Sequence, residues 1–226
     1  LLPREDLARI AEIAIEHDLW VLSDEIYSRL VYDGDFVSIS SLPDMAERTI
    51  LVDGFSKAYA MTGWRLGFAV VNTELAALFD TFMANAHSCT ATFTQYAGIE
   101  ALTGPQHEVE KMRLKSLKRR DLVVTELNRV PGFRCHMPLG AFYAFPNVTE
   151  ACRMAGLADA DQLQDALLDD AGVAVLSMSA FHSPNGPKDD QYIRISYAAG
   201  EREILEGTRR IRDFMTSRIG RSGRHI

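Results

Sequence analysis

Helical and extended patterns of apolar positions alternate through residues 1 to 71. Residues 4 to 17 place apolar side chains at three- and four-residue intervals, which predicts an amphipathic helix with this stripe: Leu7, Ile10, Ala11, Ala14 and Ile15. Short apolar runs at 19–22, 49–52 and 65–71 predict strands, the first of which ends at Ser23-Asp24. Glycine, proline and several serines make residues 33 to 48 rich in loops. Strands that alternate with helices in this way predict an α/β fold.

Helical periodicity then dominates residues 73 to 129. One predicted helix carries an apolar face made of Leu75, Leu78, Phe79, Phe82 and Met83. The pattern breaks between residues 87 and 92, and a second helix passes through Tyr96 and Ile99 and ends at Gly104-Pro105. A long helix is predicted from about residue 106 to 129.

The chain changes character after a turn at Pro131-Gly132. Short strands are predicted around 134–136, 141–145, 173–176 and 192–196, with helices near 159–170 and 201–217. We therefore predict three segments. Residues 1–104 form the remainder of a large, mostly parallel domain, 105–130 a connecting helix, and 131–226 a small α+β domain.

Chemistry is concentrated at the ends of two predicted strands. Lys57 follows the strand at 49–52, with Ser56 before it and Arg65 after it, and Asp24 ends the strand at 19–22. Ligands of open α/β sheets bind at the carboxyl edge of the strands, so these side chains can share one cleft that suits a phosphorylated cofactor. A lone lysine in a loop is ordinarily a solvated surface residue, so the pattern alone leaves that alternative open.

Composition excludes several classes of function. The net charge of −7 disfavours nucleic acid as a partner. No apolar run approaches the ~18 residues of a membrane span, so we expect a cytoplasmic protein. Three widely spaced cysteines predict no disulfide framework, and six histidines lack metal-ligand spacing, so we expect no metal. The tail from 218 to 226 is expected to fray. A basic cluster is predicted to be a solvated helix surface: Lys111, Arg113, Lys115, Lys118, Arg119 and Arg120.

The string Gly-Phe-Ser-Lys-Ala-Tyr-Ala-Met-Thr-Gly-Trp-Arg-Leu-Gly at 54–67 closely resembles the lysine motif of class I/II pyridoxal-phosphate-dependent aminotransferases of fold type I. The resemblance continues through residues 23–27, 140–146 and 192–197, and so covers nearly the whole chain. The family begins with a substantial amino-terminal portion that this sequence lacks. We therefore expect the chain to be incomplete on its own.

The resemblance implies a cofactor role for five residues. Lys57 would hold pyridoxal 5'-phosphate as a Schiff base and shuttle the α-proton, and Asp24 would keep the pyridine nitrogen protonated. Tyr27 would donate a hydrogen bond to the ring oxygen, while Ser56 and Arg65 would bind the phosphate. Taken singly, these residues also suit an N-cap aspartate, a half-buried packing tyrosine, a turn serine and a surface arginine.

For the substrate, the resemblance implies that Arg194 binds the α-carboxylate. An arginine within an apolar strand needs a partner, since burying an unpaired charge costs several kcal/mol. Two positions depart from the family: Gly54 stands where serine is frequent, and residues 177–181 replace the usual Pro-Gly-Ser-x-Phe. Tyr59 and His87 lie where they can approach the cofactor, and we assign neither a role.

The implied function is transfer of an amino group between an amino acid and a 2-oxo acid, by a homodimer. A fold type I lyase and the ligand-sensor domain of a transcription regulator are the alternatives. Substrate choice stays open, because residues 66 to 109 contain no lysine or arginine for a second carboxylate.

Overall fold

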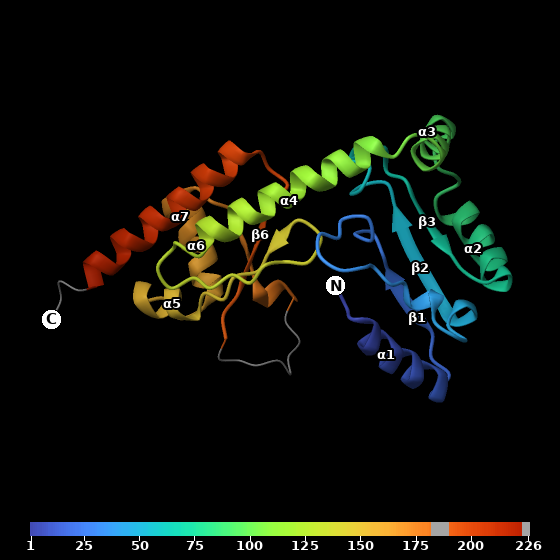
Figure 1. Cartoon of the computed structure of the whole chain (residues 1–226), viewed down its shortest axis with the longest axis horizontal. Helices are drawn as coiled ribbons and strands as arrows, with labels where there is room; N and C mark the ends of the chain where they lie inside the picture. The colour runs from blue at the N-terminus through green and yellow to red at the C-terminus, as the bar shows by residue number, and fades with distance from the viewer. Residues whose placement is uncertain (182–189, 223–226) are drawn as a thin grey trace. The chain divides into compact units, whose positions relative to one another are not determined.

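The computed structural model describes residues 1–181 and 190–222 (Figure 1). The chain divides into two compact units, Leu1–Arg113 and Leu114–Ile226. The division falls within the long helix α4, His107–Leu127, which matches the helix predicted from about 106 to 129. The predicted domain boundaries at 104 and 131 stay a proposal.

The first unit is built on a three-stranded sheet in the order β1-β2-β3. Its strands are β1 (Val21–Asp24), β2 (Thr49–Gly54) and β3 (Gly67–Val70), each close to a predicted strand. β1 pairs with β2 in parallel, whereas β2 pairs with β3 antiparallel, so this part of the sheet is mixed. Figure 1 shows the strands side by side, coloured from blue to teal. The α/β fold class is confirmed.

Helix α1 (Arg4–Glu16) packs through a narrower face than its sequence predicts. Leu7, Ala11 and Ala14 are buried against the loop between β1 and β2, which contains the short 3-10 helices η1 (Ile39–Ser41) and η2 (Ala46–Arg48). The predicted stripe was wrong at its margins, because Ile10 and Ile15 remain exposed. The contact partners Ile39, Leu42 and Met45 of this loop cover only the centre of the apolar stripe.

Helices α2 (Thr73–Ala86) and α3 (Thr92–Thr103) confirm the predicted pair and the break between them. The apolar face predicted for α2 is present, but it is uncovered. Leu78 and Phe82 are 62% and 64% exposed, and no residue of α2 is buried. An exposed apolar face of this kind is typical of a surface that packs against further protein.

The second unit has its own three-stranded sheet, in the order β4-β6-β5. The strands are β4 (Tyr143–Ala144), β5 (Leu176–Ser177) and β6 (Ile193–Ser196), all antiparallel to their neighbours. Helices α6 (Ala160–Ala171) and α7 (Glu201–Ser222) confirm the predictions, and α5 (Thr149–Ala155) was missed. The core joins the sheet to the helices through fully buried side chains: Leu127, Leu163, Leu167, Ile193, Tyr197, Ile211 and Met215.

The strand predicted at 134–136 was wrong. Arg134 forms a single bridge with Asn147, through hydrogen bonds of 3.0 and 2.8 Å. At the next residue the side chain of Asn128 takes the place of a strand: its amide donates to the Cys135 carbonyl (2.9 Å) and accepts from the Cys135 N–H (2.8 Å). The backbone groups of Cys135 point away from Asn147, and since a side chain uses both of them, no strand of the described chain pairs with that side of the segment.

The solvated helix surface predicted for residues 111–120 was wrong at Arg120, which is buried at 6% exposure. Its guanidinium pairs with Asp121 (2.9 Å) and donates to the Pro138 carbonyl (3.1 Å). A buried charge is tolerated when such partners replace water. The helix therefore uses one of its cations to fix the segment that follows the turn at Gly132.

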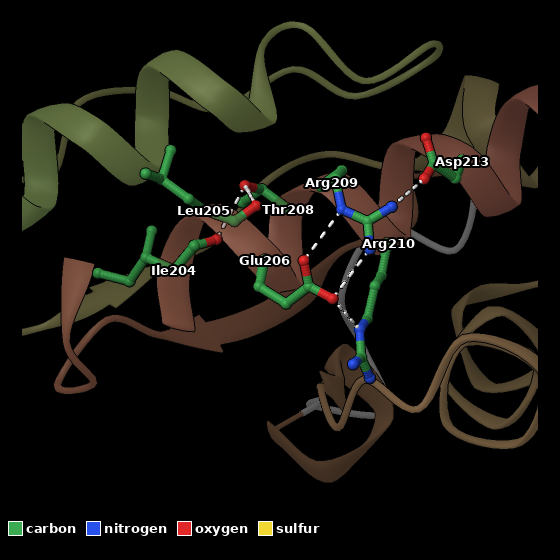
Figure 2. A network of polar contacts seen from close by, with 7 residues as sticks. All are labelled: Ile204, Leu205, Glu206, Thr208, Arg209, Arg210 and Asp213. Carbon is green, nitrogen blue, oxygen red and sulfur yellow. Dashed lines mark hydrogen bonds and ion pairs between the residues drawn. The ribbon is translucent and has the colours of Figure 1, made fainter. Parts of the chain in front are cut away.

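The tail predicted to fray is helical through Ser222, and residues 223–226 lie outside the described part of the chain. Figure 2 shows an ion-pair network along α7, where the Glu206 carboxylate points toward both Arg209 and Arg210. Arg209 also reaches Asp213 at 2.6 Å. Hydrogen bonds from Arg209 and Arg210 lower the pKa of Glu206 to about 2. Of the helices in residues 1–181 and 190–222, none combines the length and hydropathy that a membrane span requires.

Candidate active site

The parallel pairing of β1 and β2 brings two predicted site segments to one edge of the sheet. Asp24 is the last residue of β1 and stands opposite Val52 of β2. The next residue, Glu25, donates its N–H to the Val52 carbonyl at 2.8 Å. β2 ends at Gly54, so the loop that contains Lys57 leaves the sheet beside Asp24. The structure thus places Asp24 and the Lys57 loop at the same carboxyl edge, as predicted from the direction of the strands.

Strand β3 returns the chain to this edge. Gly54 stands opposite Gly67, and the Phe55 N–H donates to the Leu66 carbonyl at 3.2 Å. Arg65 therefore enters β3 beside the end of β2. A Cβ at Gly54 would lie 3.1 Å from both the Gly67 Cα and the Leu66 carbonyl oxygen, so a side chain there would require a small shift of the adjoining backbone.

The Lys57 loop has a strained backbone. Ala60 and Arg65 adopt left-handed conformations, with φ of 54° and 52°. Such conformations cost a non-glycine residue roughly 1 kcal/mol or more and concentrate at functional sites. Arg65 also donates from Nη1 to the Thr62 carbonyl at 2.9 Å, which holds one terminal nitrogen of an otherwise exposed guanidinium. The loop is closed by a hydrogen bond of 3.2 Å from the Met61 N–H to the Phe55 carbonyl.

Asp24 and Tyr27 belong to a tight turn that follows β1. An Asp24 carboxylate oxygen accepts the Ile26 N–H at 3.2 Å, so the capping role that we considered for this residue is fulfilled. Asp24 remains exposed and Tyr27 is half-buried. The turn is anchored by the buried Glu25, which accepts hydrogen bonds from Ser23 (3.1 Å) and Ser38 (2.5 Å).

A second carboxylate, Asp53, lies near this edge and was missed by the sequence analysis. Burial raises the pKa of Asp53, and the negative charge of Asp24 adds to the rise. The Gly54 N–H, which Asp53 accepts at 2.6 Å, and the positive charge of Arg29 oppose it. A carboxyl group with a raised pKa therefore lies at this edge, and such groups are frequent at functional sites.

The structure gives Tyr59 a packing role. Its hydroxyl donates to the Gln106 side chain at 3.2 Å, and its ring packs on Phe55 with centroids 5.5 Å apart. Tyr59 also lines a cavity of about 390 Å³ with residues of α3 and α4. His87 ends α2, where its N–H donates to the Met83 carbonyl at 2.9 Å.

Arg194 lies on β6, at the centre of the sheet in the second unit. Its guanidinium carbon lies 4.4 Å from the centroid of the Tyr143 ring and 4.5 Å from that of Phe181. Among the described residues, no carboxylate forms an ion pair with Arg194. The partner that we expected for a half-buried arginine is thus a pair of aromatic rings.

Comparison with known proteins identifies the family. The sequence model for aminotransferase class I and II matches residues 1–209. The chain belongs to this family. It is 39% identical over 214 residues to the aspartate aminotransferase of Bacillus sp. (strain YM-2), a match that covers 94% of this chain and 53% of that protein. It is also 39% identical to the asparagine–oxo-acid transaminase of Streptococcus mutans serotype c, over the same shares of each chain.

Among solved structures, the aromatic aminotransferase from Pyrococcus horikoshii OT3 superposes with a TM-score of 0.87 at 39% identity. That match covers 96% of this chain and 57% of the other. The chain therefore spans about half the length of the aminotransferases that it matches. These relatives do not favour the lyase or sensor-domain alternatives.

Sequence analysis missed the residues that surround Arg194. Tyr143 and Phe181 lie far from Arg194 in the sequence. The signal that could have found Tyr143 is alternation, because Tyr143 and Phe145 fall on one face of a predicted strand. Phe181 is the last residue of the altered 177–181 segment, and its contact depends on tertiary structure.

Proposed function

We propose that the protein containing residues 1–226 is an aminotransferase that moves an amino group between an amino acid and a 2-oxo acid, with pyridoxal phosphate bound at Lys57. The observation that supports this most is the meeting of Asp24 and the Lys57 loop at one sheet edge, with Arg65 beside them. Family membership supports the cofactor, because class I and II aminotransferases use pyridoxal phosphate.

The residues at this edge suit the chemistry of the cofactor. Pyridoxal phosphate supplies an aldehyde that joins to amines and a protonated ring that withdraws electrons from the bond being broken. A phosphate dianion suits a hydroxyl and a guanidinium, which Ser56 and Arg65 provide from the two ends of the loop. The strained loop is consistent with selection for the placement of these groups.

Each residue then has a defined task in the proposed reaction. Lys57 binds the cofactor and carries the α-proton between carbons, and Asp24 holds the ring nitrogen protonated. Tyr27 donates to the ring oxygen. In the second unit, Arg194 binds the substrate α-carboxylate through its paired N–H donors. We also propose that the full-length protein is a homodimer, which sedimentation will test, and that it is located in the cytoplasm.

The decisive experiment is chemical. Borohydride reduction of the full-length protein with its cofactor, followed by peptide mapping, should place the label on Lys57. Lys57→Ala should abolish transamination, whereas Asp24→Ala should keep weak cofactor binding and lose most of the turnover. Lys118→Ala is the matched control, since Lys118 is an exposed lysine of α4. A label on any other lysine would refute the assignment.

A further inference from the structure

One face of the β4-β6-β5 sheet carries Arg194 together with aromatic side chains. Residues alternate between the faces of a strand, so Ile193 and Ile195 face one side and Arg194 and Ser196 the other. Ile193 is fully buried and lies in the core, which assigns the first side to the protein interior. Tyr143 stands opposite Ser196 and therefore shares the Arg194 face.

The two rings nearest to Arg194 come from opposite neighbours of β6. Tyr143 belongs to β4, and Phe181 ends the 3-10 helix η4 (Met178–Phe181), which directly follows β5. Rings with centroids 4.4 and 4.5 Å from the guanidinium carbon attract the cation through their π-faces, and among the described residues no carboxylate pairs with its N–H groups. A planar guanidinium held in this way can bind a carboxylate through two parallel hydrogen bonds.

The position of Phe181 is itself fixed by helix α6. Ser179 donates its hydroxyl to the Asp161 carboxylate at 2.6 Å, and Ser177 donates to Ser179 at 3.2 Å. The Ser177 N–H also donates to the side chain of Gln164 at 2.8 Å. Hydrogen bonds from Ser177 and Ser179 lower the pKa of Asp161, which keeps the acceptor charged. The serines of the altered 177–181 segment thus tie η4 to α6.

We propose that Tyr143 and Phe181 are positioning residues that orient Arg194 toward the substrate α-carboxylate, and that the Ser179–Asp161 hydrogen bond holds Phe181 in place. This inference rests on the proposed role of Arg194. It adds that the hydrogen bonds of Ser177 and Ser179 fix this turn, where Ser177 and Met178 stand in place of the family's proline and glycine.

The test compares donors with and without an α-carboxylate, in the full-length protein loaded with pyridoxal phosphate. Single-turnover rates are followed by the absorbance of the cofactor. Each amino acid is compared with the amine that lacks its α-carboxylate: L-phenylalanine with phenethylamine, L-alanine with ethylamine, and L-aspartate with β-alanine. The pair whose amino acid reacts fastest with the parent protein is then used for the variants. Phe181→Leu should lower the second-order rate constant for the amino acid by about three- to tenfold and leave that for the amine unchanged. Phe181→Tyr keeps a ring and should restore the rate.

Ser179→Ala should produce a smaller loss of the same kind, about two- to threefold, because Phe181 remains but is less firmly held. Leu168→Ala is the matched control. Leu168 of α6 has a similar exposure, 52% against 50% for Phe181, and it is not one of the side chains that contact Arg194. This control should change the amino acid rate less than twofold.

Two outcomes overturn the inference. Equal losses with the amino acid and the amine would mean general damage to the site, and an unchanged amino acid rate in Phe181→Leu would remove the positioning role. Arg194→Leu separates this failure from failure of the proposed function. If Arg194→Leu slows the amino acid reaction while Phe181→Leu does not, only the inference fails. If Arg194→Leu itself has no effect, the proposed carboxylate role fails.

Discussion

Gly98 of α3 lies directly against Phe55, which sits two residues before Lys57. A Cβ at position 98 would be 3.3 Å from the Phe55 Cζ and 2.5 Å from the Leu66 Cδ2. The helix thus contacts both ends of the loop between β2 and β3. A side chain at Gly98 would have to displace one of these residues, and the loop that presents Lys57 would move with it.

We therefore expect Gly98→Val to destabilise the full-length protein by about 1–3 kcal/mol through overpacking, and to reduce cofactor occupancy at Lys57. The free energy of unfolding in urea and the borohydride label on Lys57 are the measurements. Gly63→Ala is the control, because a Cβ there meets nothing within 4 Å. Equal effects of the two substitutions would show that the α3 contact does not support the loop.

Gly132 and Gly156 separate two costs of replacing a glycine. Both have positive φ, at 80° and 67°. A Cβ at Gly132 would also lie 2.5 Å from the Ala151 N and 2.6 Å from its Cα, whereas one at Gly156 meets nothing within 4 Å. Gly156→Ala should thus cost about 1 kcal/mol of backbone strain. Gly132→Ala should cost at least about 3 kcal/mol in the same urea titration, since backbone atoms must move as well. Similar losses would contradict this separation.

Much of the fold follows from local periodicity. The helices at 4–16, 73–86 and 92–103 and the strands at 21–24, 49–54 and 67–70 were predicted because each has its own apolar pattern and its own stop signal. The shared edge of Asp24 and Lys57 follows from the direction of parallel strands. Family resemblance added the roles of these residues, which periodicity cannot supply.

The remaining features depend on contacts between distant residues. Nothing local shows that Asn128 will bind the backbone of Cys135 and so end a strand, or that Arg120 will be buried beside Pro138. Helix α5 is only seven residues long and too short for a clear period. The uncovered faces of α1 and α2 have apolar patterns that predict burial, but a sequence pattern does not say which surface covers them.

Asn128 provides a direct test of a side chain that replaces a strand. Asn128→Ala should destabilise the protein by about 1–3 kcal/mol, because the Cys135 N–H and carbonyl both lose their partner. Asn128→Asp keeps the acceptor but loses the donor, so its loss should be intermediate. Asn85→Ala is the control: this exposed asparagine of α2 makes a single bond of 2.7 Å to the Thr81 carbonyl. A loss in Asn128→Ala no larger than in the control would refute the role.

The buried thiols Cys135 and Cys152 should make stability decline in alkali. Burial raises the pKa of each to about 11, with the charge of Asp159 adding to the effect at Cys152. The pKa of a cysteine in the unfolded chain is about 8.5. Between pH 8.5 and about 11 the unfolded state therefore binds fewer protons than the folded state. Stability from the neutral thiols is therefore complete below about pH 8.5 and is lost as the pH rises toward 11. Each thiol should contribute roughly 3 kcal/mol to this loss, because one pKa unit corresponds to about 1.4 kcal/mol.

Cys135→Ser and Cys152→Ser remove the thiol titration and keep a small hydroxyl that can donate to the same carbonyl as the thiol. For Cys152 this is the Asp159 carbonyl, 3.3 Å from Sγ. Urea unfolding at several pH values between 7 and 11 should show a shallower alkaline decline in each variant than in the parent. Cys89→Ala is the control, because Cys89 is exposed and its removal should leave the slope unchanged. Tyrosines and lysines titrate in the same range in every variant, so the difference between slopes isolates the thiols. Parallel slopes for all the variants would mean that burial does not hold these thiols neutral.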